Sequence, residues 1–462
     1  MSEHCGYIVQ IKELQKHPNA DRLQIAIIFG NSVIVDLKTK IGDLGVFFPI
    51  DLQLSEEYCR ENDLVRRKDE NGNAAGGYLD PNKRNIRAMR FRGSPSEGLF
   101  LPLNTLAYTG KTQFEVGEKI DNINGHEICC KYIPRNSMHE PTRKLGNKTR
   151  KKKVPIAPLF LEHADTEQLA YNLDAFRAGD LIEITLKMHG TSARTGYLPK
   201  LKKFKRSLWD IIRRKEGTPI YDWGYVTGTR RVVLNDFSGG FYGDNSFREP
   251  HAKFFEGKLN KGEEVFGEIV GFTDDGIPIM PNANNTKTYD KKFIKTYGQT
   301  TIFSYGCDSL KEPKSKFYVY RMTMTNEDGT IVEYPPDFVR YRCEQMGVEY
   351  VPVLWRGIIP PANADGLVRS DDFIADENGQ FKEWIFKTPG EYIKDIAEQF
   401  YDGPDPIGKT HIREGVVVRI VNRPKFCAYK HKNWFFKCIE GIIKNEAIEP
   451  DREEKEDILE EV

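Results

Sequence analysis

The sequence predicts an α+β protein in which a small β-barrel precedes a larger domain built on an antiparallel sheet. From Gly6 to about Leu103, short runs of β-branched and aromatic residues alternate with turn-rich pieces such as "HPNAD" and "KIGDLG". Such runs favour five or six short strands, which suit a small barrel. From residue 156 onward, strand-like segments recur between helical stretches and long loops. Because strands and helices do not alternate regularly, a parallel βαβ fold is excluded.

Shifts in composition divide the chain into four segments. We predict a barrel domain at residues 1–125, a basic linker at 126–155, the larger domain at 156–446 and an acidic tail at 447–462. The tail has the composition of a disordered segment. Directly after the linker, "DTEQLAYNLDAF" (Asp165–Phe176) predicts a helix with Asp165 as its N-cap and Gln168 at the capping-box position.

The composition excludes some classes of protein but does not identify a binding partner. Lys and Arg together number 68, as do Asp and Glu, so the net charge points to no partner. Two strongly basic stretches, residues 141–153 and 198–217, favour an anionic one. The eight cysteines form no C-x-x-C pair and fit neither a zinc site nor a secreted disulfide framework. Without a signal segment or an apolar run long enough to span a membrane, we expect a cytoplasmic protein with no membrane partner. We also expect a monomer.

The stretch "LIEITLKMHGTSARTGYL" (Leu181–Leu198) contains the most informative lysine. An apolar run with the alternation of a strand ends on Lys187, just before a glycine and two small hydroxyls. A lysine in that place is either structural or a nucleophile, and a nucleophile must lose its proton through burial or neighbouring positive charge. Lys430 and Lys432, in "AYKHKN", offer such charge. Alone, the pattern K-x-H-G is too short to decide between the two.

Five further short motifs follow Lys187. In chain order, "TGTRR", "EEVFGEIVGF", "KFYVYRM", "REGVVVR" and "AYKHKN" contain Arg230, Glu268, Tyr320, Glu414 and the pair Lys430 and Lys432. Each has a plain structural explanation when taken singly: a glutamate at a strand end is often salt-bridged, and an aromatic residue in a strand often belongs to the core. Together they extend over more than half of the chain, from Lys187 to Lys432.

These motifs, in this order, resemble those of the covalent nucleotidyltransferase superfamily of polynucleotide ligases and mRNA capping enzymes. In detail they are most similar to the phage RNA ligase 2 type. The resemblance implies an ATP-grasp-like ligase domain, in which Lys187 becomes covalently linked to AMP from ATP. It also implies that Lys430 and Lys432 contact the α-phosphate, with Lys437 in "WFFKCIEG" as the alternative for one of them.

The same resemblance assigns roles to the other motifs. It implies that Arg230 contacts phosphate or RNA, that Glu268 binds the ribose, and that Tyr320 stacks on adenine. Glu414 is expected to help bind a divalent metal, Mg²⁺ or Mn²⁺. His189 lies between the lysine and the glycine of the first motif and is grouped with the nucleotide-binding residues. No second histidine or cysteine stands at ligand spacing from it, so packing or a hydrogen bond is the better interpretation than metal ligation.

The N-terminal segment resembles an oligonucleotide-binding (OB) barrel. "HPNADRLQIA" (His17–Ala26) also occurs in tRNA-binding barrels of the synthetase type, and a barrel before a ligase array resembles the Deinococcus-type RNA ligases. In "RNIRAMRFRGSPSEGLFLPL", Arg87, Arg90 and Arg92 are candidates for contact with a nucleic-acid backbone. The alternative is a solvated strand edge kept from aggregating by its charges.

Three functions remain open at this point. The first is an ATP-dependent RNA ligase that joins 3′-OH and 5′-phosphate ends of RNA, or of RNA/DNA hybrids, through a lysyl-AMP and an AMP-capped 5′-phosphate. The second is a GTP-dependent mRNA capping guanylyltransferase, and a DNA ligase is less favoured because the K-x-D-G-x-R spelling is missing. The third is a non-catalytic RNA-binding protein. The basic stretch at 198–217 either binds RNA or is a solubilising loop.

Overall fold

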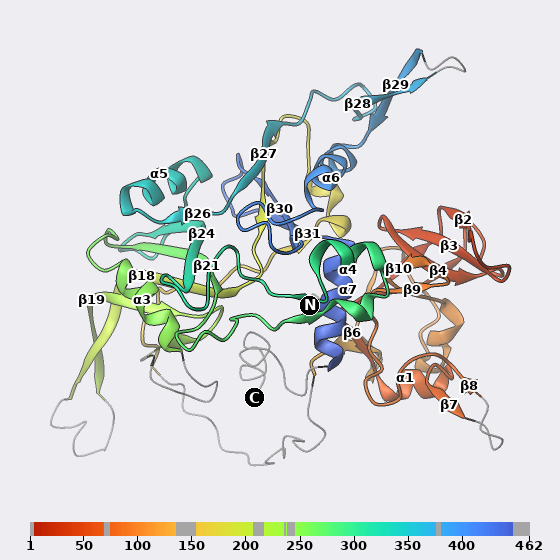
Figure 1. The fold of residues 1–462 in the computed structure, drawn as a ribbon, viewed down its shortest axis with the longest axis horizontal. Coiled ribbons are helices and arrows are strands. Elements are labelled where there is room, and N and C mark those ends of the chain that lie inside the picture. Colours follow the sequence, from red (N-terminus) through yellow and green to blue (C-terminus); the bar gives the residue numbers. More distant parts are fainter. Residues whose placement is uncertain are drawn as a thin grey trace. The chain divides into compact units, whose positions relative to one another are not determined.

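The polypeptide divides into two units, each described separately. The N-terminal unit comprises Met1–Pro134 and Lys437–Ala447, and the large unit comprises Arg135–Phe436 and Ile448–Val462. The computed structural model describes residues 4–68, 74–134, 154–206, 217–234, 237, 245–375 and 380–446 (Figure 1). The predicted acidic tail and residues 135–153 of the predicted basic linker lie outside the described residues. The three predicted boundaries between these four segments stay a prediction.

Short strands build the N-terminal unit. A four-stranded antiparallel sheet has the order β11 (Gly98–Pro102), β5 (Leu44–Pro49), β1 (Gly6–Gln10) and β12 (Lys119–Ile120). A three-stranded sheet is formed by β2 (Leu14–Lys16), β3 (Leu23–Ile28) and β4 (Asn31–Asp36). Two-stranded pairs are β6 (Leu52–Leu54) with β15 (Cys129–Lys131), β7 (Arg66–Lys68) with β8 (Ala74–Gly76), β9 (Met89–Phe91) with β10 (Ser94–Ser96), and β13 (Asn122–Ile123) with β14 (His126–Glu127).

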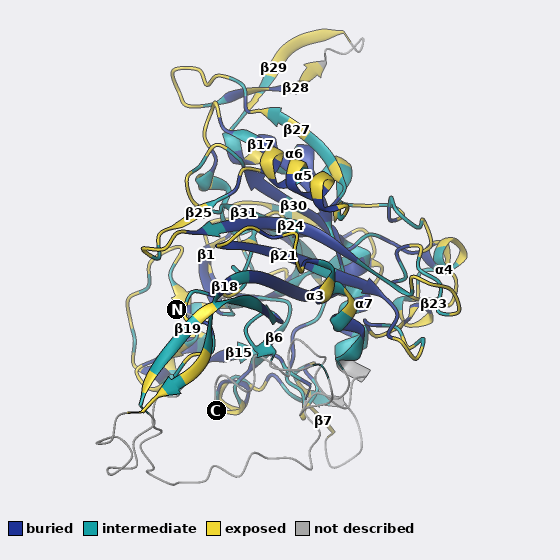
Figure 2. Cartoon of the chain, turned by 90° about the vertical axis from the view of Figure 1, so that its left-hand side faces the viewer, coloured by how far each residue is buried: buried dark blue, intermediate teal, exposed yellow. Residues whose placement is uncertain are grey.

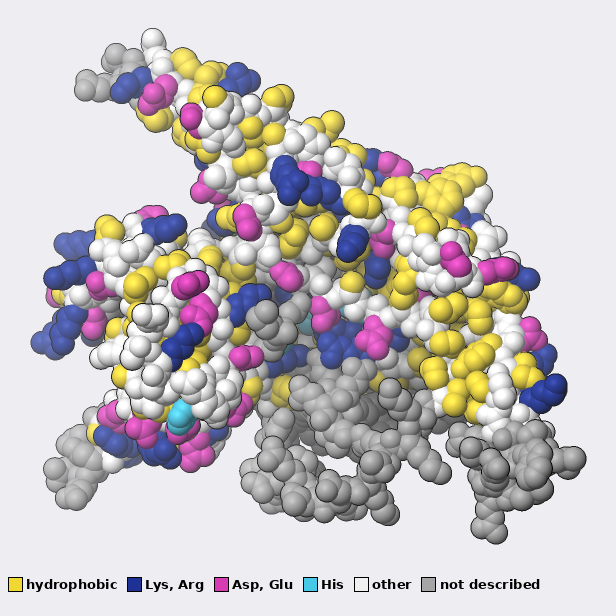
Figure 3. All heavy atoms as spheres, turned by 180° about the vertical axis from the view of Figure 1, so that it is seen from behind, with side chains coloured by type: hydrophobic (Ala, Val, Ile, Leu, Met, Phe, Trp, Pro, Cys, Tyr) yellow, Lys and Arg dark blue, Asp and Glu magenta, His cyan; other side chains and the backbone are white. Residues whose placement is uncertain are grey.

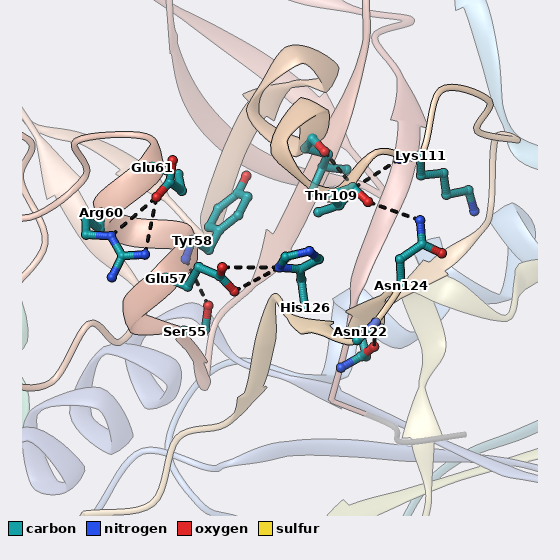
Figure 4. A network of polar contacts seen from close by, with 12 residues as sticks. Ser55, Glu57, Tyr58, Arg60, Glu61, Thr109, Lys111, Asn122, Asn124 and His126 are labelled. Carbon is teal, nitrogen blue, oxygen red and sulfur yellow. Dashed lines mark hydrogen bonds and ion pairs between the residues drawn. The ribbon is translucent and has the colours of Figure 1, made fainter.

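One short helix closes the core of this unit. Helix α1 (Glu56–Glu61) begins after Ser55, whose hydroxyl accepts a hydrogen bond from the amide of Tyr58 at 3.0 Å. The Tyr58 ring is buried among Ile8, Val46 and Phe48. Figure 4 shows Glu57 of α1 paired with His126 of β14, at 3.1 Å. The helix is therefore held by its cap, by an apolar contact and by one hydrogen bond between side chains.

Two sheets form the large unit. The larger has the order β20 (Val233–Leu234), β19 (Thr218–Gly228), β18 (Thr191–Lys205), β21 (Glu263–Gly271), β24 (Ser315–Thr325) and β25 (Ile331–Glu333), with β26 (Glu349–Tyr350) beside β24. The smaller has the order β16 (Glu167–Gln168), β31 (Ala428–Lys432), β30 (Gly415–Ile420), β17 (Leu181–Lys187) and β27 (Val353–Ile358). Neighbours are antiparallel except β16 with β31 and β24 with β26.

Alternate side chains of β17 and β30 are buried on the same face of the smaller sheet, and these side chains form its core. Ile182 and Ile184 of β17 pack with Val416 and Val418 of β30 on one face, because alternate residues of a strand point the same way. Helix α6 (Pro389–Phe400) covers this face with its buried Ile393 and Ala397 side chains. Figure 2 shows the central strands β21, β24 and β30 coloured as buried, which places both sheets in the interior. Because these strands are buried, they hold the residues at their ends in fixed positions.

The remaining α-helices and strands belong to the large unit, apart from α7, which is divided between the two units. They are α3 (Glu249–Phe254), α4 (Lys291–Tyr297), α5 (Pro336–Met346), α7 (Trp434–Glu446), the pair β22 (Ala283–Asn284) with β23 (Thr300–Thr301), and the hairpin β28 (Val368–Ala375) with β29 (Phe381–Lys387). Helix α7 begins in the large unit and continues, from Lys437, in the N-terminal unit. The strand-rich mixture with few helices confirms the predicted α+β class. Within the described residues no helix has both the length and the apolarity needed to cross a bilayer.

The predicted helix at Asp165–Phe176 is wrong. This segment forms the short strand β16 and two 3₁₀ turns, at Leu169–Tyr171 and Leu173–Ala175. The Asp165 carboxylate does not cap a helix, because it binds the guanidinium of Arg230 from a distant part of the chain. A long-range ion pair has overridden a local capping signal. The eight cysteines, all within the described residues, are thiols.

Candidate functional site

Register across three strands brings Lys187 and Lys432 to the same place. Lys187, the last residue of β17, is paired with Gly415 of β30, and Gly415 is paired with Lys432 of β31. Directly paired residues of antiparallel strands point to the same face. Lys430, two residues before Lys432, shares that face by alternation. The structure thus brings the three predicted catalytic lysines to one face of the smaller sheet, near the adjoining ends of β17, β30 and β31.

Glu414 lies at the centre of this lysine group. Its Oε1 is 2.8 Å from the Nζ of Lys187 and 3.5 Å from the Nζ of Lys432. The Glu414 side chain is 2% exposed, and those of Lys187 and Lys432 are 22% and 14% exposed. Two cations share one buried carboxylate oxygen, so the site has positive charge to offer an anion. The two lysines are thus more exposed to solvent than the carboxylate between them.

Glycine is required directly after Glu414. Gly415 has φ of +151°, and a Cβ there would approach the carbonyl oxygen of His431 to 2.1 Å. The close approach of β31 therefore demands glycine at the start of β30. This explains the pairing of Glu and Gly in "REGVVVR": the glycine lets the two strands meet, and the glutamate is presented where Lys187 and Lys432 end.

Glu268 faces the turn that follows Lys187. Strand β21 places it opposite Ser192 of β18, and the Ser192 hydroxyl is 3.4 Å from Glu268 Oε2. Gly190 lies against the same strand, because a Cβ at this position would come within 2.4 Å of the carbonyl oxygen of Ile269. The backbone at "HG" of the first motif is thus in close contact with strand β21, which contains the "FGE" of the third motif.

The His189 ring is held by packing. It meets the rings of Phe303 and Phe436 edge-on, with centroid distances of 4.5 and 4.9 Å. Its Nδ1 lies 3.7 Å from Glu414 Oε2. The amide of His189 donates a hydrogen bond of 2.7 Å to the hydroxyl oxygen of Tyr305. The ring is thus packed beside Lys187, and the grouping of His189 with the nucleotide-binding residues stays a prediction.

Tyr305 is a residue that the sequence analysis did not single out. Its ring is fully buried and meets the His411 ring at 4.5 Å. Burial raises the pKa of Tyr305 well above its ordinary value, and the nearby Glu414 carboxylate adds to this effect. The phenol therefore stays protonated and neutral. Through its hydrogen bond with the His189 amide, Tyr305 holds the backbone between Lys187 and Gly190 in place.

Arg230 forms the centre of a second group. Its guanidinium binds Asp165, and Arg231 lies 3.3 Å from the other carboxylate oxygen. Burial acts to raise the pKa of Asp165, but the charge and hydrogen bonds of Arg230 outweigh it and hold that pKa below the usual value. Asp165 therefore stays ionised and keeps the guanidinium of Arg230 in place.

Tyr320 belongs to the same group. It is the extra residue of a β-bulge, since Phe266 pairs with Arg321 and Gly267 with Val319. The Tyr320 hydroxyl is 2.7 Å from His163 Nδ1, and the amide of His163 donates to the carbonyl oxygen of Arg230 at 3.0 Å. Bulges re-aim side chains, and this one directs Tyr320 toward the Arg230 segment.

Two more residues that support the site were missed by the sequence analysis. The buried Arg248 donates to the carbonyl oxygen of Ser192 at 2.8 Å and to the Thr191 hydroxyl at 2.6 Å. Asn433 accepts hydrogen bonds from the amides of Phe435 and Phe436, and so caps α7. An asparagine before an apolar helical pattern was a readable signal. Arg248 gave none, because only the tertiary fold brings it to β18.

The chemistry of the donor set fits a divalent cation. Glu414 Oε2 is buried and accepts no hydrogen bond. Within the described residues, no three His, Cys, Asp or Glu side chains are grouped as a complete metal site. Magnesium commonly binds through one or two carboxylates, with water and substrate phosphates as the other ligands. A single carboxylate with one oxygen that accepts no hydrogen bond agrees with such a shared site.

The predicted arginines of the N-terminal unit lie around the β9–β10 turn. Arg90 belongs to β9 and donates to the carbonyl oxygen of Gly93 at 2.9 Å, while Arg92 is exposed in the turn with φ of +46°. His17 contacts the carbonyl oxygen of Phe91 at 3.1 Å, so the "HPNAD" loop supports this turn. Arg87 is half-buried, ahead of β9. Lys437, the alternative lysine, pairs with Glu97 of the same unit.

Comparison with known proteins gives two family matches. The model of the RNA ligase family matches residues 180–438, more than half of the chain. An OB-fold domain model matches residues 6–103. No curated protein matches the sequence.

Solved structures with the same fold come from a Naegleria gruberi RNA ligase. A mutant with AMP and Mn is 17% identical, with a TM-score of 0.54 over 94% of this chain and 98% of that one. A second mutant, with ATP and Mn, is 17% identical with a TM-score of 0.53 over 94% and 97% of the two chains. The enzyme with PPi is 17% identical with a TM-score of 0.54 over 93% and 96%. At this identity the likeness establishes the fold, an OB-type barrel followed by a ligase domain.

Proposed function

The chain belongs to the RNA ligase family, and from that premise we propose that it joins 3′-hydroxyl and 5′-phosphate ends of RNA in an ATP-dependent reaction. The observation that carries this proposal is the group of Lys187, Glu414 and Lys432 at the adjoining ends of three strands. The Naegleria ligase structures with ATP, AMP, PPi and Mn support ATP as the nucleotide and a divalent cation as the cofactor.

The reaction has three steps. In the first, the Nζ of Lys187 gives up a proton and attacks the α-phosphorus of ATP, which forms a P–N bond as the bond to pyrophosphate breaks. In the second, a 5′-phosphate oxygen of RNA takes the AMP from Lys187. In the third, a 3′-hydroxyl attacks that 5′-phosphorus and releases AMP. Each step is a phosphoryl transfer, for which positioning and charge are the main requirements.

The remaining residues of the site position the nucleotide. Lys432 and Lys430 share the face of Lys187 and neutralise the α-phosphate. Glu414 would hold the divalent cation through Oε2, and the cation would offset the charge that develops on pyrophosphate. His189, packed against Phe303 and Phe436, keeps the turn after Lys187 in place.

A second set of residues contacts the sugar, the base and the outer phosphates. Glu268 accepts from the ribose hydroxyls, Tyr320 stacks on adenine, and Arg230 binds phosphate or RNA. The ion pair with Asp165 and the contact of Tyr320 with His163 support these positions. In the N-terminal unit, Arg87, Arg90 and Arg92 contact the RNA backbone.

Covalent labelling tests the first step without any RNA. The protein with α-labelled ATP and Mg²⁺ or Mn²⁺ is expected to retain label, and Lys187→Ala to retain none. Label from GTP in place of ATP would favour the capping guanylyltransferase instead. RNA binding without labelling by either nucleotide would favour a non-catalytic protein.

Sealing assays test the substrate. Nicked duplexes with every RNA and DNA combination at the break should be joined when the 3′-hydroxyl strand is RNA, including in RNA/DNA hybrids. Joining of DNA 3′-hydroxyl ends alone would contradict the RNA substrate. Sedimentation of the purified chain, expected to be a monomer, tests the oligomeric state separately.

A further inference from the structure

The two longest paired strands of the large unit continue beyond the sheet. Strand β21 pairs with β18 at Thr191–Gly196 only, whereas β19 pairs with β18 as far as Lys205. Residues 197–205 of β18 and 218–225 of β19 therefore form a two-stranded extension, the lysine arm. In Figure 1 the arm projects from the sheet toward the grey trace at the lower left, and in Figure 2 it is coloured as intermediate and exposed.

Register sorts the side chains of the lysine arm onto two faces. Lys200, Lys203 and Lys205 are paired with Asp222, Ile220 and Thr218. These partners alternate along β19, so the three lysines lie on one face. Lys202 occupies the irregularity between Leu201 and Lys203, and its ammonium reaches Asp222 at 2.6 Å. Four lysines thus share one face.

That face is exposed and carries little compensating charge. Lys202, Lys203 and Lys205 are exposed, and Lys202 retains 61% of its side-chain surface. Among the described residues of the arm, Asp222 is the sole acid. Within the described part of the chain, neither Lys203 nor Lys205 forms an ion pair. In Figure 3, Lys and Arg side chains border the grey residues at the lower right, where the arm ends.

The opposite face is aromatic and supports the arm. Tyr197 and Tyr225 stack at 4.7 Å with an angle of 18°, and Trp223 lies 5.9 Å from Tyr197. The Tyr225 hydroxyl accepts from the amide of Gly257 at 2.5 Å, and Lys261 lies over the Trp223 ring at 5.3 Å. These contacts make the arm a stiff ribbon, so the lysine face is presented in a fixed arrangement.

Protection of a strand edge does not account for the lysines. The outer edge of β18 is already covered at Leu201, whose amide donates to the carbonyl oxygen of Ile156 at 2.7 Å. The Tyr221 hydroxyl also binds the carbonyl oxygen of Pro155. Edge protection is served by charges of either sign, whereas this face carries four lysines and one acid. Exposed like charges on one face repel, and an anionic ligand would remove that repulsion.

We infer that the lysine face of this arm binds the phosphodiester backbone of the RNA substrate, at a distance from the joined ends. The inference rests on the proposed function for the choice of RNA. Strand β18 begins directly after Gly190, so it runs outward from the nucleophile. At ~3.3 Å per residue, Lys200 lies about 30 Å and Lys205 about 45 Å along the strand from Thr191. At ~2.8 Å per base pair of an A-form RNA duplex, this corresponds to roughly 11 to 16 base pairs from the break.

The test compares a triple variant, K202A/K203A/K205A, with the wild-type protein on nicked RNA duplexes. The arms of the duplexes are about 6 or about 20 base pairs long, so only the longer ones extend to the lysine face. On long duplexes the variant should bind about 10- to 100-fold more weakly at low salt, with a salt slope smaller by about 2 to 3. On short duplexes its affinity should equal that of the wild type. Covalent labelling of Lys187 should be unchanged.

Two further variants complete the test. K202R/K203R/K205R keeps the charge and should restore binding to the long duplexes, whereas K291A/K292A/K295A removes three exposed lysines of α4 and should leave the salt slope unchanged. Equal loss on short and long duplexes, or no larger loss in the arm variant than in the α4 variant, would overturn the inference. Binding is measured without ATP, so a failure of the proposed ligation reaction would be seen separately, in the labelling assay.

Discussion

At the scale of single residues, the site depends on how tightly the turn after Lys187 is held. Lys187 and Glu414 are brought together by strand register, but the backbone between them and β18 is fixed by side chains from elsewhere. Tyr305 accepts from the His189 amide, and Arg248 binds Thr191 and Ser192. These contacts hold the backbone from His189 to Ser192, directly after Lys187.

Replacing Tyr305 by phenylalanine should slow lysine adenylation by about tenfold and lower the free energy of unfolding by about 1–3 kcal/mol, because the buried His189 amide loses its acceptor. Single-turnover labelling and urea denaturation measure the two effects. Tyr334→Phe is the matched control, since it removes a buried hydroxyl 3.3 Å from Glu263. It should lower stability alone. An equal slowing of adenylation in both variants would contradict the positioning role of Tyr305.

Glu264 should make stability depend on pH. Burial raises the pKa of Glu264 to about 8, and the attraction of Arg194 offsets this only in part. Because the folded pKa lies above the unfolded value, the contribution of Glu264 is fully present below about pH 4.5 and is lost as the pH rises toward 8. The slope is at most about 1.4 kcal/mol per pH unit.

Urea denaturation between pH 5 and 8.5 tests this dependence. The free energy of unfolding of the wild-type protein should fall across the range more steeply than that of Glu264→Gln, whose amide cannot ionise. Parallel curves for the two proteins would show that Glu264 does not titrate in this range.

At the scale of elements, the decisive feature is the contact between β18 and β21 beside Lys187. Gly190→Ala would place a methyl group 2.4 Å from the carbonyl oxygen of Ile269 and 2.9 Å from Glu268 Cγ. The strands must separate, so the variant should lose several kcal/mol of stability, as overpacking does, and should adenylate at least tenfold more slowly. Thermal unfolding and labelling measure both.

Gly224→Ala is the control for this prediction. Its nearest neighbours, atoms of Lys200, would lie at 3.6 Å, which is ordinary contact. Normal stability and labelling are expected for this variant. If Gly190→Ala behaved in the same way, the close packing of the first motif against β21 would not be needed.

A substitution in the lysine arm is expected to strengthen RNA binding instead of weakening it. Asp222→Asn removes the acid that pairs with Lys202. The affinity for long RNA duplexes should rise a few-fold and the salt slope should steepen by up to about 1, because one more lysine becomes available to phosphate. Equilibrium binding at several salt concentrations measures this. Unchanged affinity and slope would indicate that RNA does not contact this face.

At the scale of the whole molecule, the sequence motifs predicted which residues the structure brings together at Lys187 better than local patterns predicted their surroundings. The strand ending at Lys187 and the glycine after Glu414 were readable, because period-two patterns and glycine positions are local. Tyr305, Arg248 and the ion pair of Asp165 were not, because each depends on segments that only the tertiary fold brings together. The helix expected at Asp165–Phe176 failed for the same reason. The likeness in fold to the Naegleria ligase extends over both units, and the order of barrel and ligase domain is the same in both proteins.

The position of AMP on the protein tests the central claim most directly. The protein is incubated with ATP and a divalent cation, digested, and analysed by mass spectrometry for lysine-linked AMP. The adduct is expected on the peptide containing Lys187, and Lys187→Ala should abolish it. An adduct on Lys430 or Lys432, or one that persists in Lys187→Ala, would contradict the role of Lys187 as the nucleophile.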